Sequence, residues 1–252
     1  MMDVILLTSN FLYSNSLDNI EKIVNEVSVM RFLTDQTTIP VPFILHSGTK
    51  QESPLALSPF IPMEYIEHET KMNDPLNTPG LPREQRGVLD PDIAEDKLRR
   101  LYAQMADVLL QLSLPALPRT APHHSSTGER PLPSLPGWST WELTYAAPVQ
   151  FSHAPPWWLL IERPEEWAGG VEEWTRVFEA RPRTFLQVMQ EGEGQKIQRG
   201  RLHEGQRLSG AMRRSWEGGD FWVLYALRNS FAFDLVYWLK IDERFWGLVD
   251  EG

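Results

Sequence analysis

The chain has 252 residues, of which 42 % are apolar or aromatic and 23 % are charged, a composition typical of a globular protein and not of a disordered one. Its formal net charge of -10 disfavours nucleic acid as a partner, because phosphate binding needs a basic surface. It contains no cysteine, so disulfides and thiolate metal sites are excluded.

The sequence predicts neither a signal peptide nor a membrane span. The segment Met1–Thr8 has an acid where a basic region should lie, and its apolar run is short. The most apolar stretch, Phe221–Leu239, is interrupted by Arg228, Asn229 and Asp234 and falls short of the roughly 18 apolar residues of a transmembrane helix. We therefore expect no membrane partner and a soluble protein of the cytoplasm.

Residues 1–66 predict a small unit of a helix and a few strands. Asp3–Leu7 is typical of a buried strand, and Asp18–Thr34 of a helix that must end before Pro40. Two further strands are predicted over Phe43–His46 and Phe60–Ile66. The apolar face of the helix is expected to consist of Ile20, Ile23, Val24, Val27, Met30 and Leu33.

A second long helix is predicted over Pro91–Ser113, within a segment spanning residues 67–114. Asp90 is a plausible cap, and Pro91 suits the first helical position. Its expected apolar stripe is Leu98, Leu101, Met105, Val108, Leu109 and Leu112. Residues 115–140 follow, with six prolines between Pro115 and Pro136, and we interpret them as a linker without its own core.

The part after the linker, residues 141–252, is expected to be helical. All ten tryptophans lie between Trp138 and Trp246, and we interpret them as large apolar packing residues in preference to ligand-stacking platforms. Helices are predicted after Pro155-Pro156, over Val171–Gln190 with a kink at Pro182, over Arg201–Trp216 and over Asp220–Lys240. The fold class is therefore α+β, with few strands and a mostly helical C-terminal half.

Several motifs occur in the order found in one enzyme family. They are Asn25–Leu33, Ile39-Pro40-Val41-Pro42, Phe60–Ile66, Trp141–Pro148, Ala154–Leu160, Arg207–Gly210 and Ser215–Trp222. Together they resemble the aminoglycoside phosphotransferase and choline-kinase-like family, particularly its fungal branch. The resemblance covers roughly residues 20–114 and 141–247 and implies an incomplete protein-kinase-like fold, with a small N-terminal lobe and a helical C-terminal lobe.

The resemblance implies roles for two sites in the N-terminal unit. Glu26 lies where the family pairs a helix glutamate with a strand lysine that positions the nucleotide phosphates. The hinge that receives adenine would consist of Met63, Glu64, Tyr65 and Ile66. Each site has a plainer interpretation: Glu26 as a solvated helix residue, and Phe60–Ile66 as a core strand.

The catalytic residues that the family requires are missing. Phosphoryl transfer needs an Asp to orient the acceptor, an Asn, and an Asp for magnesium. The sequence contains no Asp-x-x-x-x-Asn, and none of its six histidines is followed two positions later by Asp. No glycine precedes Gly48, so a glycine-rich phosphate loop before the first helix is absent as well. We therefore predict no catalytic residue in this chain.

The metal-binding motif survives only as a remnant. Where the family has Asp-Trp-Glu, this chain has Thr140, Trp141 and Glu142. A neutral threonine hydroxyl does not replace a carboxylate charge on a hard cation. The histidine positions also lack zinc-site spacing, so no metal is expected.

These observations leave three hypotheses. The first is a kinase-like protein that has lost its catalytic segment between residues 114 and 141 and does not transfer phosphate, with no cofactor. The second is a module that binds a nucleotide or a protein through the hinge or the Trp-rich helices. The third is an active small-molecule phosphotransferase that uses ATP and magnesium through residues such as Glu142. Loss of the middle segment predicts exposed apolar surface, and with it self-association or a protein partner.

Overall fold

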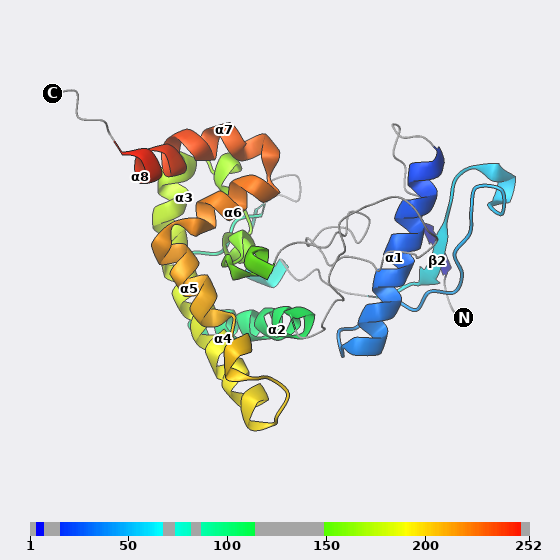
Figure 1. The fold of residues 1–252 in the computed structure, drawn as a ribbon, viewed down its shortest axis with the longest axis horizontal. Helices are drawn as coiled ribbons and strands as arrows, with labels where there is room; N and C mark the ends of the chain where they lie inside the picture. The colour runs from blue at the N-terminus through cyan, green and yellow to red at the C-terminus, as the bar shows by residue number, and fades with distance from the viewer. Residues whose placement is uncertain (1–3, 8–15, 68–73, 82–86, 114–148, 248–252) are drawn as a thin grey trace. The chain divides into compact units, whose positions relative to one another are not determined.

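The structure is a computed structural model that describes residues 4–7, 16–67, 74–81, 87–113 and 149–247. These residues divide into two compact units, one formed by those up to residue 67 and the other by those from residue 74 onward. Most of the described elements are helices, and the N-terminal unit contains a two-stranded sheet (Figure 1). The expected composition of many helices and few strands is thus observed.

The N-terminal unit consists of one long helix and an antiparallel strand pair. Helix α1 spans Ser16–Gln36, and strands β1 (Val4–Leu7) and β2 (Ile61–Glu64) pair in antiparallel register, with Val4 opposite Glu64. Ile23 and Val27 of the helix are buried with Ile61 of β2, and Ile44 and Met63 pack against them. The helix therefore covers the strand that leads into the predicted hinge.

The predicted strand over Phe43–His46 is wrong. In its place lies a single bridge between Ile44 and Met63. The backbone N–H groups of Leu45 and His46 both donate to the carbonyl oxygen of Pro62, at 3.0 and 3.4 Å. Proline has no N–H to donate in return, so a regular ladder does not form at this position.

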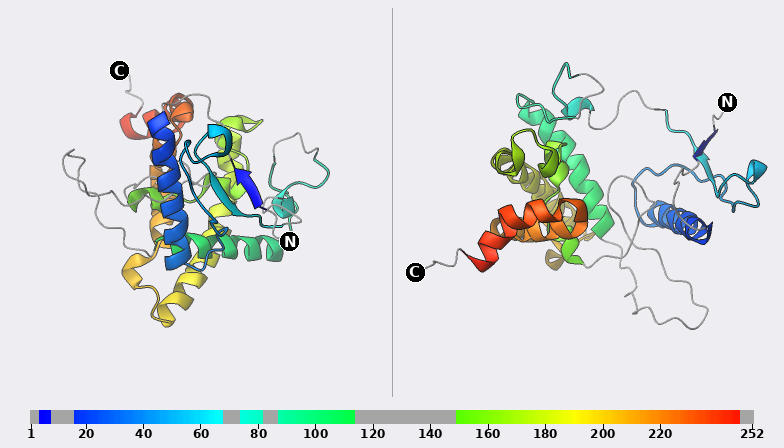
Figure 2. Two further views of the ribbon diagram at one scale, coloured as in Figure 1. Left: turned by 90° about the vertical axis from the view of Figure 1, so that its right-hand side faces the viewer. Right: turned by 90° about the horizontal axis from the view of Figure 1, so that it is seen from above.

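The second unit is helical and is built around α4. Its longer helices are α2 (Glu95–Ser113), α3 (Gly170–Phe178), α4 (Ala180–Gln198), α5 (Ser209–Gly218) and α6 (Asp220–Arg228). Helix α2 packs across α4, α3 and α5 also contact α4, and α6 packs against α5 (Figures 1 and 2). The chain closes with α7 (Phe233–Val236), a π-helical turn (Tyr237–Ile241) and α8 (Asp242–Trp246).

Several helix boundaries differ from the prediction: α5 begins at Ser209 and not at Arg201, and the helix predicted over Asp220–Lys240 ends as α6 at Arg228. Two further differences involve a proline. Helix α2 begins at Glu95 and not at Pro91, because the Asp90 carboxylate accepts the N–H of Asp92 at 3.0 Å and forms a turn before the helix. The predicted kink at Pro182 corresponds to a one-residue interruption: α3 ends at Phe178, α4 starts at Ala180, and Glu179 between them keeps helical dihedral angles (φ -52°, ψ -34°). Proline has no N–H to donate to the carbonyl four residues earlier, here that of Phe178, so the helical hydrogen bonding is interrupted there.

Aromatic side chains fill the core of the second unit. Trp174 is fully buried, stacks on Phe178 with ring centres 4.2 Å apart, and meets Trp222 edge to face at 5.7 Å. Its indole N–H donates to the backbone oxygen of Glu162 at 3.0 Å. The packing role predicted for the tryptophans is confirmed for these residues. Trp238 and Trp246, by contrast, are about two-thirds exposed, at 68 % and 65 %.

Candidate functional site

The predicted hinge begins within strand β2 and extends two residues past its end. Met63 and Glu64 close β2, and their backbone is engaged on the side away from β1: Met63 bridges Ile44, and the N–H of Glu64 donates to the oxygen of Phe43 at 2.8 Å. Tyr65 and Ile66 lie beyond the strand with nearly half of each side chain exposed.

Glu26 lies on the helix that packs against this strand. Its side chain is half-buried, next to Val27, which is buried with Ile61 of β2. The structure thus brings the helix of Glu26 and the hinge strand into one small unit. Two cavities formed by described residues lie in the second unit, and neither is lined by Glu26 or by the hinge.

The remnant of the metal motif, Thr140, Trp141 and Glu142, lies outside the described residues. Within the parts of the chain that the structure describes, no three His, Asp or Glu side chains come together in a way that could hold a metal ion.

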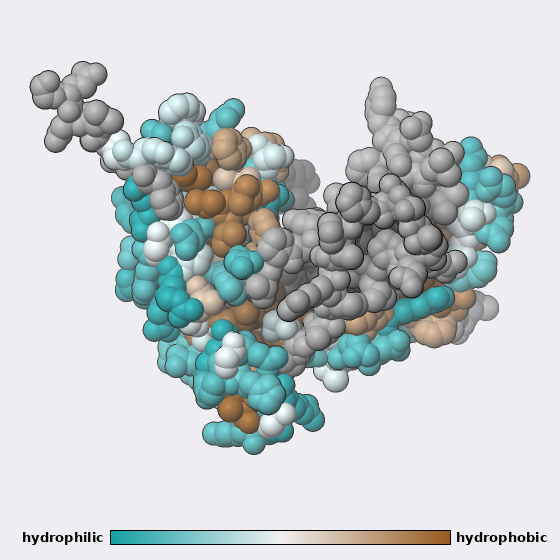
Figure 3. All heavy atoms as spheres, viewed as in Figure 1, coloured by the Kyte–Doolittle hydropathy of each residue, from teal (hydrophilic) through white to brown (hydrophobic). Residues whose placement is uncertain are grey.

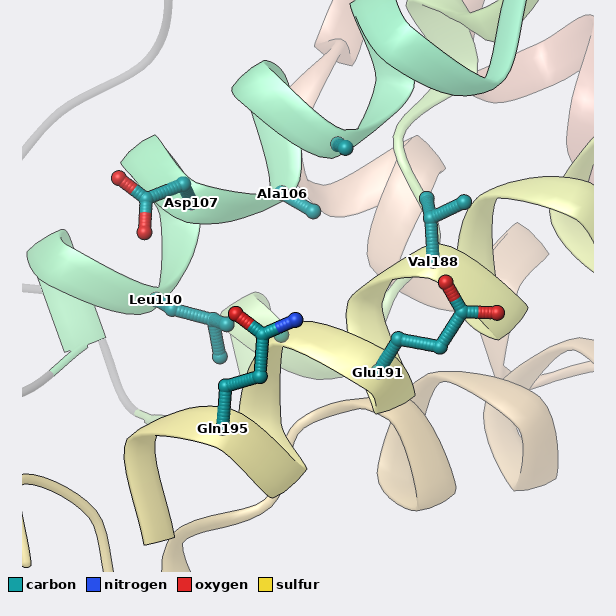
Figure 4. Close-up of a pocket in the computed structure, with 8 residues that line it drawn as sticks. Ala106, Asp107, Leu110, Val188, Glu191 and Gln195 are labelled. Atoms are coloured by element: carbon teal, nitrogen blue, oxygen red, sulfur yellow. The ribbon is translucent and has the colours of Figure 1, made fainter. Parts of the chain in front are cut away.

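A cavity of about 190 Å³ lies between α2 and α4 (Figure 4). Ala106, Leu110 and Val188 form apolar walls, and Asp107, Glu191 and Gln195 supply polar groups. Both carboxylates are already paired: Asp107 with Lys196 at 2.7 Å, and Glu191 with Arg99 at 2.8 Å. Ligand pockets usually exceed about 300 Å³, so we interpret this cavity as a gap left by small residues where two helices cross.

The environment of Asp107 lowers the pKa of its carboxyl group. Partial burial acts to raise the pKa, but hydrogen bonds from Lys196 and Gln111 and the charge of Lys196 outweigh it. A carboxylate held ionised in this way is a poor general acid or base near neutral pH. Its ion pair with Lys196 joins α2 to α4.

A wider groove of about 1110 Å³ runs between α3 and α4 on one side and α5, α6 and the C-terminal helices on the other. Trp216, Trp222 and Leu186 supply its apolar lining. Its charged lining residues include two ion pairs, Lys240 with Glu172 at 2.7 Å and Arg183 with Glu179 at 2.9 Å. Glu172 and Glu179 thus form ion pairs with lysine and arginine, and they do not form a cluster that could bind a cation.

Sequence reasoning missed the most enclosed carboxylate of the second unit. Glu193 of α4 is fully buried. It accepts the backbone N–H groups of Leu208 and Ser209, at 2.7 and 2.9 Å, and the Ser209 hydroxyl at 2.6 Å. Arg207 lies 3.5 Å away. The carboxylate thereby caps the first turn of α5 from another helix, and only its long-range position reveals this role.

A second buried polar contact joins Tyr225 to Glu165. The tyrosine hydroxyl donates to the carboxylate at 2.6 Å, and burial first, then this hydrogen bond and the charge of Glu165, raise the pKa of Tyr225. A tyrosine with a raised pKa stays protonated at neutral pH and does not act as a base. The pair links α6 to the segment before α3.

Comparisons with protein-family models, with curated proteins and with solved structures find no match for this chain. Among the described residues, no helix is both long enough and apolar enough to cross a bilayer.

Proposed function

We propose that this protein is a kinase-like chain of the aminoglycoside phosphotransferase type that binds a nucleotide but does not transfer its phosphate. The observation that carries the second half of the proposal is the state of its carboxylates. Five carboxylates line the two cavities, and four of them, Asp107, Glu191, Glu172 and Glu179, are paired with a lysine or arginine at 2.7–2.9 Å. Magnesium would have to displace these cations to use more than the fifth, Glu217.

The sequence supports the same proposal independently. Phosphoryl transfer depends on positioning and on neutralising charge at the transferred group. The chain lacks the Asp-x-x-x-x-Asn pair that would do this, and Thr140 occupies the place of the metal-binding aspartate in the resemblance. Both the acceptor-orienting group and the charge on the metal are therefore missing.

The order of elements in the N-terminal unit supports the kinase-like half. A helix carrying Glu26 is followed by Ile39-Pro40-Val41-Pro42 and then by β2, which ends at the exposed Tyr65 and Ile66. A helix packed on a small antiparallel sheet with a hinge after its last strand is what the resemblance implies. The helical second unit fits a C-terminal lobe.

The test is thermal stabilisation of the full chain by ATP, with and without magnesium. A ligand that binds only the folded form raises its stability by mass action. We expect no additional shift when magnesium is added to ATP, and magnesium alone serves as the control. A shift with ATP that is the same with and without magnesium would support nucleotide binding without transfer. A shift that requires both would contradict the proposal.

A further inference from the structure

The helical segment over residues 227–246 carries apolar side chains on two sides. Its inner side, with Ala232, Val236 and Ile241, is buried in the main core. Large apolar side chains elsewhere on the segment expose 41–68 % of their surface; they are Leu227, Phe231, Phe233, Leu235, Trp238, Leu239 and Trp246, here called the C-terminal apolar face. A surface helix normally carries polar residues opposite its core side, so this arrangement leaves an interface unfilled.

Members of this face are close together. Phe231, Leu235 and Trp238 lie in three consecutive helical turns of different type: a 3-10 turn (Ser230–Ala232), α7 and the π-helical turn. Phe233 stacks on Tyr237 at 5.7 Å, and Tyr237 also meets Trp238 and Trp246, at 5.1 and 6.1 Å. Apolar surface gathers where α6 and α7 lie (Figure 3).

The size of the face fits one half of a stable dimer interface. Its side chains expose on the order of 800 Å² of surface, given the 150–250 Å² of an aromatic side chain. Summed over the seven side chains, that value is of the same order as the roughly 800 Å² that each partner buries in a standard interface.

The charges around the face favour a second copy as the occupant. The whole chain carries a net charge of -10, yet residues 227–246 hold three basic residues and three acidic ones, so this segment is neutral. Two copies can therefore meet here without like-charge repulsion. A membrane-surface helix would carry an excess of lysine and arginine on its polar side, which this segment lacks.

We propose that two copies of this chain associate through the C-terminal apolar face. In a twofold-symmetric interface, a residue i that contacts residue j of the partner is matched by residue j contacting residue i of the partner. Leu235 has Phe231 four residues before it and Leu239 four residues after it. Antiparallel pairing with the axis at Leu235 would place Phe231 against Leu239 of the partner subunit, so both copies would cover their exposed side chains.

The experiment measures the mass of the full chain in solution by sedimentation over a dilution series. We expect a species of twice 29.1 kDa that dissociates on dilution. Leu235→Lys and Leu235→Glu should each give monomers, because like charges would meet at the axis. An equimolar mixture of the two variants should restore the dimer. Leu57→Lys and Leu57→Glu, at an exposed position of the other unit, are the matched controls and should leave the dimer intact.

Three results would overturn the proposal. The first is a monomeric parent chain at every concentration, including one that instead binds lipid vesicles. The second is a dimer that persists in both Leu235 variants. The third is a mixture of the two variants that stays monomeric. Circular dichroism checks that the variants fold, and Trp238→Ser, at a more exposed position, replaces them if they do not.

Discussion

Removal of the Glu193 side chain should unfold the second unit more readily than any surface substitution. This carboxylate is fully buried and accepts three hydrogen bonds from Leu208 and Ser209. In Glu193→Ala two buried backbone N–H groups lose their acceptor, and the first turn of α5 loses its link to α4.

The magnitude follows from these contacts. Removing one partner of a buried, charge-assisted network costs about 3–5 kcal/mol, because the remaining groups stay buried without partners. In a domain of this size the corresponding drop in Tm is roughly 10 °C. Glu193→Gln keeps an oxygen that can accept both N–H groups, so its cost should be smaller, about 1–2 kcal/mol.

Urea unfolding followed by tryptophan fluorescence measures this difference, because the described tryptophans all belong to the second unit. Glu191→Ala is the matched control. It lies two residues earlier on α4, and its ion pair with Arg99 is largely exposed, so its cost should stay below about 1 kcal/mol. If Glu193→Ala were no more destabilising than Glu191→Ala, the capping role of Glu193 would be refuted.

Four further predictions concern the second unit. Ser215 is buried and its hydroxyl has no hydrogen-bond partner among the described residues, so Ser215→Ala should keep or raise stability, by up to about 1 kcal/mol, in the same urea assay. Gly194 has open space where a Cβ would lie, and Gly194→Ala should stabilise α4 by about 1 kcal/mol. Gly219→Ala should instead lower the Tm, because Gly219 has φ +81° and the Arg244 side chain occupies the place of a Cβ. The folded state lowers the pKa of Asp107 from 3.8. The contribution of Asp107 to stability is therefore present above that pH and is lost as the pH falls through the pKa of the folded state. The difference in stability between the parent chain and Asp107→Asn should close in acid, and a constant difference would contradict the assignment.

Local signals in the sequence predicted α1 and most of α2, but not the breaks within Arg201–Trp216 and Asp220–Lys240. The apolar spacing of Ile23, Val27, Met30 and Leu33 predicted α1, and all of these side chains are buried. Val24, placed on the same face from its spacing, is half exposed. Periodicity identifies which side of a helix packs against the rest of the protein, but not how many residues on that side are buried.

The prolines indicated where helices are interrupted, but the start of α2 was predicted four residues too early. Asp90 and Pro91 have the types of a cap and a first helical residue, yet they form a turn four residues before α2. Pro182 lies in the first turn of α4, where its missing N–H costs nothing. Whether a proline starts, kinks or ends a helix depends on tertiary packing that the local sequence does not contain.

The candidate sites show the same division. The hinge and Glu26 were proposed from motifs, and the structure places them on adjoining elements of one unit. Glu193 could not be identified, because its partners lie 15 and 16 residues away across a loop. Exposed apolar surface was expected from the loss of a middle segment, and the C-terminal apolar face has this character, although its position could not be predicted.

The most direct test of the central proposal is a phosphate-transfer assay with labelled ATP and magnesium, at high protein concentration and with a range of small hydroxyl and amine acceptors. The account predicts that label transfer and ATP hydrolysis equal those of a protein-free blank, and that Glu142→Gln changes neither. Magnesium-dependent turnover above the blank that Glu142→Gln abolishes would contradict it and would identify this chain as an active phosphotransferase.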